Sequence, residues 1–249
     1  MSNHQVGTRE EWLAARRALL AREKELTRRS DELARERRAL PWVPVETEYV
    51  FATDAGPRTL AELFDGRSQL LVYHLMFGPD DEAACPGCTY YSDHLDGSLE
   101  HLAAHDVTLL AASRAPLSKL QAYRRRMGWR FPWVSSHGTA FNLDFTLFTE
   151  AERRAGRGYN FGTPGALGID LNDTEVMAFS AFALGEDGTV FHTYSAYDRG
   201  TDVLNPAWQL LDRAPLGRDA TATCDGPPAG WPRRRDEYDP APELSLAAG

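Results

Sequence analysis

Two cysteines separated by two residues are the part of this sequence best equipped for chemistry. They stand in the tetrapeptide Cys85-Pro86-Gly87-Cys88. A thiolate attacks a disulfide or a peroxide, and a second thiol one helical turn away can resolve the mixed product. The chain has only 3 cysteines, which argues against a structural disulfide framework. The pair is therefore predicted to be redox-active or metal-binding, and the third cysteine, Cys224, is expected to be a free surface thiol.

The segments on either side of the pair predict how it is held. Residues 70–77 form a near-continuous apolar run, which is typical of a strand covered on both faces. Residues 89–105 carry leucines at three- and four-residue spacing, which indicates an amphipathic helix. Cys85 would lie at its cap and Pro86 at its first position. The N–H groups and the dipole at the start of a helix would lower the pKa of the Cys85 thiol.

Composition limits the classes of function. A net charge of −9 argues against nucleic acid as a partner, because phosphate binding needs clustered cations. The one basic run, residues 233–235, is followed at once by two acids and is interpreted as a solvated tail segment. The first residues have no apolar signal-peptide core, and no later stretch has the roughly 18 to 20 apolar residues of a membrane span. We therefore expect a cytoplasmic protein with no membrane partner.

The beginning of the chain predicts one long helix. Residues 8–40 are rich in Arg and Glu and free of Gly and Pro, and Thr8 with Glu11 forms a capping-box pattern. Five apolar residues recur there every seven positions, namely Trp12, Leu19, Leu26, Leu33 and Leu40. This single apolar seam suits either an arm lying across its own domain or a dimerisation arm. We expect a homodimer formed through this helix.

The remaining elements predict a mixed sheet. Helix and strand patterns alternate from residue 70 to residue 135, which indicates parallel strands joined by crossovers. Residues 175–184 and 189–197 flank a Gly-Glu-Asp-Gly turn and predict an antiparallel hairpin, and residues 205–211 predict a closing helix. The predicted organisation is a helical arm (1–44), an α/β domain (45–215) and an irregular tail (216–249).

This order of elements resembles the thioredoxin fold in its extended, peroxiredoxin-like form. More closely, the sequence resembles a bacterial thioredoxin-like family of unknown function. The matching segments are residues 11–16, 39–43, 72–79, 85–88, 125–136 and 191–195. The resemblance implies a thioredoxin-like α/β fold and a dithiol–disulfide oxidoreductase. Glu82 and Gly78 stand where a peroxiredoxin places Thr or Ser and Pro before its reactive cysteine, so a standard peroxidase site is not expected.

The leading hypothesis is a dithiol–disulfide oxidoreductase. Cys85 would be the thiolate nucleophile and Cys88 the resolving thiol. The partner would be a protein or a small molecule carrying a thiol or a disulfide, and no cofactor would be required. Tyr90, Arg126 and Arg130 are candidates for contacting the substrate, with the two arginines suited to an anion.

Two other hypotheses compete with it. The pair could bind copper or zinc with the help of histidine, because soft thiolates and imidazole suit both metals. The candidate ligands are Cys85, Cys88, His74, His94 and His192, the last being expected on the hairpin near the cysteines. The third hypothesis is a catalytically silent thioredoxin-fold module that dimerises through the helical arm.

Overall fold

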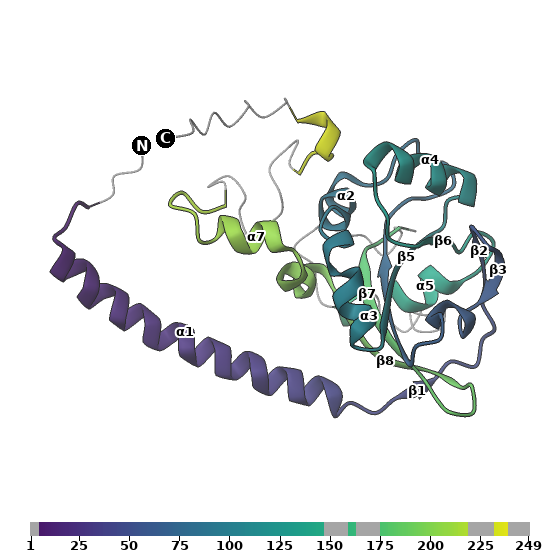
Figure 1. Ribbon diagram of the computed structural model, residues 1–249, viewed down its shortest axis with the longest axis horizontal. Helices are drawn as coiled ribbons and strands as arrows, with labels where there is room; N and C mark the ends of the chain where they lie inside the picture. The colour runs from purple at the N-terminus through teal and green to yellow at the C-terminus, as the bar shows by residue number, and fades with distance from the viewer. Residues whose placement is uncertain (1–4, 147–158, 163–174, 219–231, 239–249) are drawn as a thin grey trace. The chain divides into compact units, whose positions relative to one another are not determined.

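The computed structural model describes residues 5–146, 159–162, 175–218 and 232–238, and the chain divides into two compact units, Met1–Val43 and Pro44–Gly249 (Figure 1). The first unit is the predicted long helix, α1 (Arg9–Arg38). The Thr8 side chain accepts a hydrogen bond from the Glu11 backbone N–H, and the Glu11 carboxylate accepts one from the Thr8 backbone N–H, which confirms the capping box. No residue of α1 is buried, and its apolar seam is exposed. The homodimer stays a prediction.

The second unit is built on one mixed sheet with the strand order β1-β8-β7-β4-β5-β6-β2-β3. Its central pairs β4–β5 and β5–β6 are parallel, whereas β7 runs antiparallel to both β4 and β8. The strands are β1 (Val43–Pro44), β2 (Val50–Thr53), β3 (Gly56–Thr59), β4 (Gln69–His74), β5 (Val107–Ser113), β6 (Trp133–Ser135), β7 (Ala178–Leu184) and β8 (Val190–Tyr197). The predicted central strand and late hairpin are therefore confirmed.

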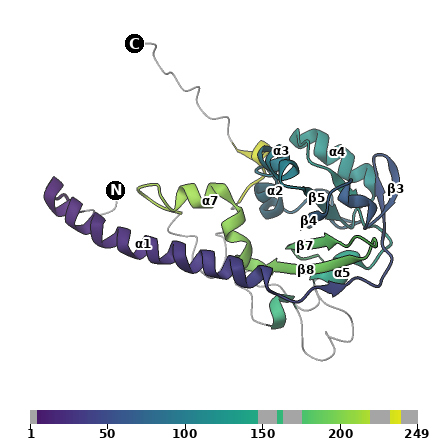
Figure 2. The same cartoon turned by 60° about the horizontal axis from the view of Figure 1, so that its bottom comes forward.

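Helices cover both faces of this sheet. In Figure 2, α2, α3 and α4 lie on one side of the strands and α5 lies on the other. The α-helices are α2 (Pro86–Ser92), α3 (Leu99–Ala104), α4 (Leu117–Met127), α5 (Phe141–Thr146) and α7 (Pro206–Leu211). The short 3-10 helices are η1 (Glu62–Phe64), η2 (Asp96–Ser98), η3 (Tyr159–Gly162), η4 (Asp198–Leu204) and η5 (Arg235–Glu237). Strand, Cys-x-x-Cys helix, strand and helix, followed by an antiparallel hairpin and a helix, make this a thioredoxin-like fold.

The helix after the cysteine pair is broken, unlike the continuous helix expected from the leucine spacing. It is divided into α2, η2 and α3 around Asp96-Gly97. Both residues have low helix propensity. The Asp96 carboxylate also accepts the backbone N–H groups of Arg130 and Phe131, at 2.9 and 2.8 Å, so it binds the loop after α4 instead of facing solvent on a regular helix.

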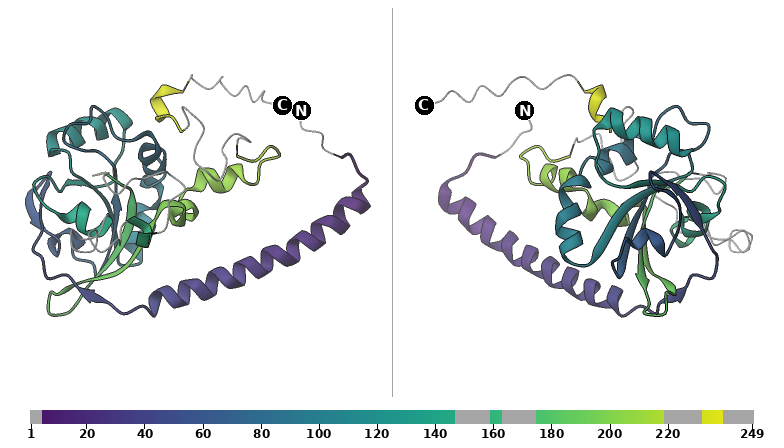
Figure 3. Two further views of the ribbon diagram at one scale, coloured as in Figure 1. Left: turned by 180° about the vertical axis from the view of Figure 1, so that it is seen from behind. Right: turned by 45° about the vertical axis from the view of Figure 1, so that its right-hand side comes forward.

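Successive residues of β4 divide between two separate cores. Tyr73 belongs to the core under α2 and α4, together with Cys88, Tyr123 and Trp133. Val72, one position earlier, belongs to the core on the opposite face, formed with η1 and α5. This alternation follows from the two-residue period of a strand. The hairpin β7–β8, green in Figure 3, extends the sheet beside β4.

Within the described part of the chain, no helix is both long enough and apolar enough to cross a membrane.

Candidate active site

The cysteine pair is held where the chain leaves β4 and enters α2. The backbone N–H of Cys85 donates to the Met76 carbonyl at 3.0 Å, which ties the turn to the end of the strand. Cys85 is the N-cap of α2 and Pro86 its first residue, as predicted. The Cys85 carbonyl then accepts from the Thr89 N–H at 2.9 Å, which begins the helix. The neighbouring strand and this turn therefore fix the backbone on both sides of Cys85.

Cys85 has the surroundings of a reactive thiol. It is partly exposed, and its pKa is lowered to about 6, chiefly because its sulfur accepts a hydrogen bond from the Cys88 thiol. The backbone N–H groups of Cys88 and Gly87 and the positive charge of Arg234 lower the pKa further, against the opposing effect of burial. A thiolate at near-neutral pH is the nucleophilic form.

Cys88 is the opposite kind of thiol. It is only 1% exposed, and burial together with the neighbouring Cys85 raises its pKa well above the usual value. Its sulfur accepts the Met76 N–H at 3.4 Å. Both cysteines are free thiols in this structure. The pair thus combines an accessible thiol that ionises easily with a buried thiol that keeps its proton.

Three buried tyrosines surround the inner thiol. Tyr73, Tyr91 and Tyr159 come from β4, α2 and η3, and each is less than 8% exposed. Burial is the main cause of their raised pKa values, and the proximity of Cys88 contributes to all three. Tyr73 lies close enough to Cys88 to oppose the rise of the thiol's pKa, although its hydroxyl makes no hydrogen bond of ordinary geometry within the described residues. The spacing of these residues along the chain contained no signal that they would meet.

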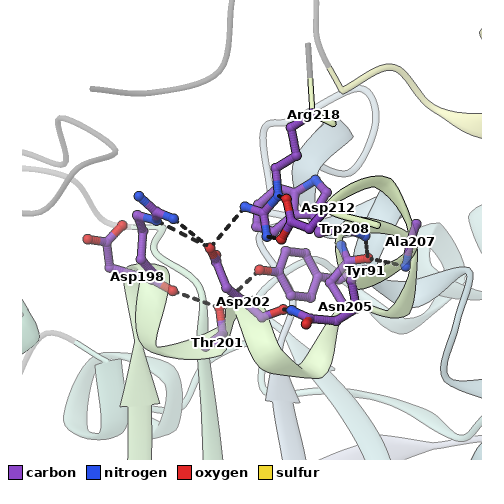
Figure 4. A network of polar contacts seen from close by, with 11 residues as sticks. Tyr91, Asp198, Thr201, Asp202, Asn205, Ala207, Trp208, Asp212 and Arg218 are labelled. Carbon is purple, nitrogen blue, oxygen red and sulfur yellow. Dashed lines mark hydrogen bonds and ion pairs between the residues drawn. The ribbon is translucent and has the colours of Figure 1, made fainter. Parts of the chain in front are cut away.

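A polar network behind Tyr91 attaches α2 to the elements that follow the hairpin. Figure 4 shows the Thr201 hydroxyl donating to the Tyr91 oxygen at 3.2 Å, next to Asp202 and Arg218. Arg218 donates to the Asp202 carboxylate at 3.2 Å, and its guanidinium lies over the Trp208 ring, 4.8 Å from the centroid. Trp208 in turn meets Tyr91 edge-on. These contacts support the inner side of the cysteine helix.

The C-terminal segment 232–238 reaches the same site. Arg234 donates two hydrogen bonds to the carbonyl of Ala84, the residue before Cys85, at 3.0 Å from Nε and 2.8 Å from Nη2. Arg235 binds the Met127 carbonyl at the end of α4. The interpretation of residues 233–235 as a solvated run is therefore wrong for Arg234, which is partly buried, whereas Arg233 and Arg235 are exposed. The sequence context of Arg234, a short basic run followed by acidic residues, resembles any exposed tail.

The three predicted substrate contacts occupy different surroundings. Tyr90 is half-buried on α2, and burial raises its pKa to about 12. Arg126 lies over the Tyr123 ring and pairs with Asp236 of the C-terminal segment at 2.6 Å. Arg130 is exposed and pairs with Glu100 at 3.3 Å. Arg126 thus lies beside the segment that reaches the cysteines, whereas Arg130 binds the α3 side of the domain.

The structure does not bring the cysteines together with His74 and His192. His74 stacks on Phe141 and His192 packs on Phe145, in the core on the opposite face of the sheet from Cys88. The third histidine, His94, follows α2 and meets the Tyr90 ring. Among the described residues there is no group of three His, Cys, Asp or Glu side chains placed to hold a metal ion. Cys224 lies outside the described residues.

Two solved structures illustrate how remotely this chain resembles proteins of known structure. Peroxidoxin BcpB from Mycobacterium tuberculosis is 15% identical, with 69% of this chain and 96% of that chain covered and a TM-score of 0.38. A variant of peroxiredoxin Q from Xanthomonas campestris is 18% identical, with 65% and 90% covered and a TM-score of 0.37. No curated protein matches the sequence. Over residues 1–238, however, the chain matches a family as a whole, and it belongs to that family, described as "Bacterial protein of unknown function (DUF899)".

Proposed function

We propose that this protein is a dithiol–disulfide oxidoreductase with Cys85 as nucleophile and Cys88 as resolving thiol. The observation that carries the proposal is the asymmetry of the pair. Cys85 is accessible and receives hydrogen bonds from the Cys88 thiol and from two backbone N–H groups, whereas Cys88 is buried and protonated. An attacking thiol is most effective when its pKa lies close to the ambient pH.

The reaction conserves atoms and electrons without a cofactor. The Cys85 thiolate attacks one sulfur of a substrate disulfide, forms a mixed disulfide and releases the other sulfur as a thiolate. Cys88 gives its proton to the departing thiolate and attacks the Cys85 sulfur, which releases the second substrate sulfur as a thiolate that takes its proton from water. The substrate gains two electrons and the protein gains a Cys85–Cys88 disulfide, which a small thiol or a thioredoxin-like reductant returns to the dithiol. The reverse sequence oxidises a dithiol substrate.

A redox titration tests the proposal most directly. The purified protein is equilibrated in glutathione buffers, and the state of the pair is read by alkylation and mass spectrometry. We expect a reversible two-electron transition at a potential within roughly −300 to −120 mV, the span of thiol oxidoreductases. A pair that stays reduced throughout this range would count against the proposal. Protection from alkylation that a chelator removes would favour a metal site instead.

Trapping separates the roles of the two thiols. In a Cys224→Ser background, the Cys88→Ser variant cannot complete the resolving step, so a small aromatic disulfide should leave a stable adduct on Cys85 while one equivalent of thiol is released. The matched variant Cys85→Ser in the same background should leave no adduct, because Cys88 is buried and its pKa is raised. Adduct formation on Cys88 in the second variant would reverse the assignment.

A further inference from the structure

The C-terminal segment meets the cysteine turn at several points. Arg234 binds the Ala84 carbonyl, Arg235 binds the Met127 carbonyl, and Asp236 pairs with Arg126 on α4. A Cβ atom added to Gly87, between the two cysteines, would lie 4.0 Å from Pro232. The segment therefore joins the turn before α2 to the last turn of α4, and Pro232 lies beside Gly87 of the tetrapeptide that contains both thiols.

Arg234 is the residue of this segment that points inward. It is partly buried between two exposed arginines, Arg233 and Arg235. Two of its guanidinium nitrogens donate to the Ala84 carbonyl, and the third donates to the Glu237 carboxylate at 2.7 Å. The Arg234 backbone N–H also donates to Glu237, at 3.1 Å. The planar guanidinium is thus oriented on both sides, and it keeps its charge at any pH that the protein meets.

This cation lies close enough to Cys85 to favour ionisation of its thiol. The other groups that bear on Cys85 are Cys88 on α2 and Tyr73 on β4. Tyr123 on α4 interacts with Arg234, and Glu237 partly offsets the arginine's positive charge. An opposite charge near an acid stabilises its ionised form. Among these neighbours Arg234 is the one that supplies positive charge.

We propose that Arg234 is a positioning residue of the redox site, which holds the Ala84–Cys85 peptide by its carbonyl and stabilises Cys85 as a thiolate. This inference rests on the proposed function and deepens it. If it holds, the C-terminal segment is part of the active centre, and the reactivity of Cys85 depends on that segment being seated. Because a stabilised thiolate favours the dithiol form, Arg234 also makes the Cys85–Cys88 disulfide a stronger oxidant.

The test is the pH dependence of Cys85 alkylation by iodoacetamide in the reduced protein. To isolate Cys85, the measurement is made in a Cys224→Ser background, in which Cys88 is protected by burial. We expect Arg234→Gln to raise the midpoint by about 0.5 to 1 pH unit, less than for an unscreened pair because Glu237 partly cancels the charge. At pH values below both midpoints the alkylation rate would then fall roughly threefold to tenfold.

Two further variants separate charge from anchoring. Arg234→Lys keeps the charge but not the fork that binds the Ala84 carbonyl twice, so its midpoint should lie closer to that of the parent than to that of Arg234→Gln. Arg233→Gln removes a neighbouring exposed charge and should leave the midpoint in place. Equal shifts in the Gln and Lys variants would show an anchor without an electrostatic role, and an unshifted midpoint in Arg234→Gln would overturn the proposal entirely.

Two measurements on the parent protein and Arg234→Gln distinguish a failure of this inference from a failure of the proposed function. Alkylation needs no substrate, whereas the glutathione titration measures disulfide formation. If the parent forms no reversible disulfide but Arg234→Gln still shifts the alkylation midpoint, the oxidoreductase proposal fails and Arg234 retains its effect on the thiol. The other outcome is that both proteins form the disulfide reversibly at the same potential and have the same alkylation midpoint. In that case the inference about Arg234 fails while the proposed function stands.

Discussion

The two faces of β4 both bury polar side chains, but they leave them in opposite chemical states. On the Tyr73 face, the cysteine pair reaches the surface through Cys85, whose pKa falls to about 6. On the other face, His74 is completely buried and its pKa falls to about 3, because burial penalises the charged imidazole. Near neutral pH the first face therefore holds an ionised nucleophile, and the second holds a base that stays neutral.

Hydrogen bonding explains how each state is maintained. His74 Nε2 lies 2.9 Å from the Ser180 hydroxyl, which lies 2.8 Å from Ser195, and His192 Nε2 lies 2.8 Å from the same Ser195 oxygen. This chain of hydroxyls binds Nε2 of both imidazoles without charge, while Nδ1 of His74 has no hydrogen-bond partner within the described residues. Cys85 instead receives donors that favour its anion. Cys85 and His74 therefore differ in their access to solvent and in the type of hydrogen-bond partner, and these two differences decide which of them is reactive.

The largest expected effect is confined to the cysteine face. In a Cys224→Ser background, Cys85→Ser should abolish exchange with a small disulfide, because a serine hydroxyl is not ionised near neutral pH and Cys88 is inaccessible. Ser180→Ala, on the other face, should leave the exchange rate unchanged within about twofold while lowering the free energy of unfolding by about 1 to 3 kcal/mol, since it leaves His74 without its partner. Stopped-flow kinetics and urea unfolding measure the two. A slow exchange in Ser180→Ala would show that the faces are coupled.

The next expected effect is a fall in the free energy of unfolding at low pH that is caused by His74. Its folded pKa lies below the unfolded value of 6.5, so between pH 6.5 and about 3 the unfolded chain binds the extra proton. Stability should therefore fall as the pH drops below 6.5, by up to about 1.4 kcal/mol per pH unit from this residue. His74→Gln keeps a neutral donor and should reduce that slope between pH 6.5 and 4.5. Urea unfolding at several pH values measures it, and an unchanged slope would contradict the burial argument.

Much of the fold was predictable, because it rests on local patterns. The capping box of α1, the strand before Cys85 and the N-cap position of Cys85 are all confirmed. The break between α2 and α3 was not predicted, since the leucine spacing continues through it while the Asp96 carboxylate binds a loop more than 30 residues away. Local periodicity does not record such a long-range contact.

The residues around the cysteines could not be predicted fully, because the sequence does not show which face of β4 each side chain occupies. Residues 70–77 are apolar on both faces, so nothing in the pattern shows whether Tyr73 or His74 points toward the cysteines. The strand's alternation allows only one of them, and the structure places Tyr73 there and His74 opposite. The same limit applies to Arg234, which reaches Ala84 across 150 positions of the chain.

The smallest effect tests whether Tyr73 is an active part of the cysteine face. Its hydroxyl lies near Cys88 and has no hydrogen-bond partner within the described residues, so it can donate to the Cys88 thiolate that the resolving step requires. Tyr73→Phe keeps the ring and removes this donor, and a hydrogen bond to a charged group is worth roughly 1.5 kcal/mol or more, so release of the second substrate thiol should slow by about tenfold. Rapid mixing with a chromogenic disulfide separates this step from the initial attack by Cys85, which should be unaffected.

Tyr49→Phe is the matched control on the opposite face. Its hydroxyl donates to Asp144 at 2.6 Å, so the substitution also removes one hydrogen bond to an acid, but far from the thiols in the second core. We expect it to lower stability and to leave both exchange steps unchanged. If Tyr73→Phe only lowers stability in the same way, Tyr73 is a packing residue. If resolution slows in Tyr73→Phe alone, the buried hydroxyl takes part in the reaction, because loss of packing or stability alone would not separate the two steps.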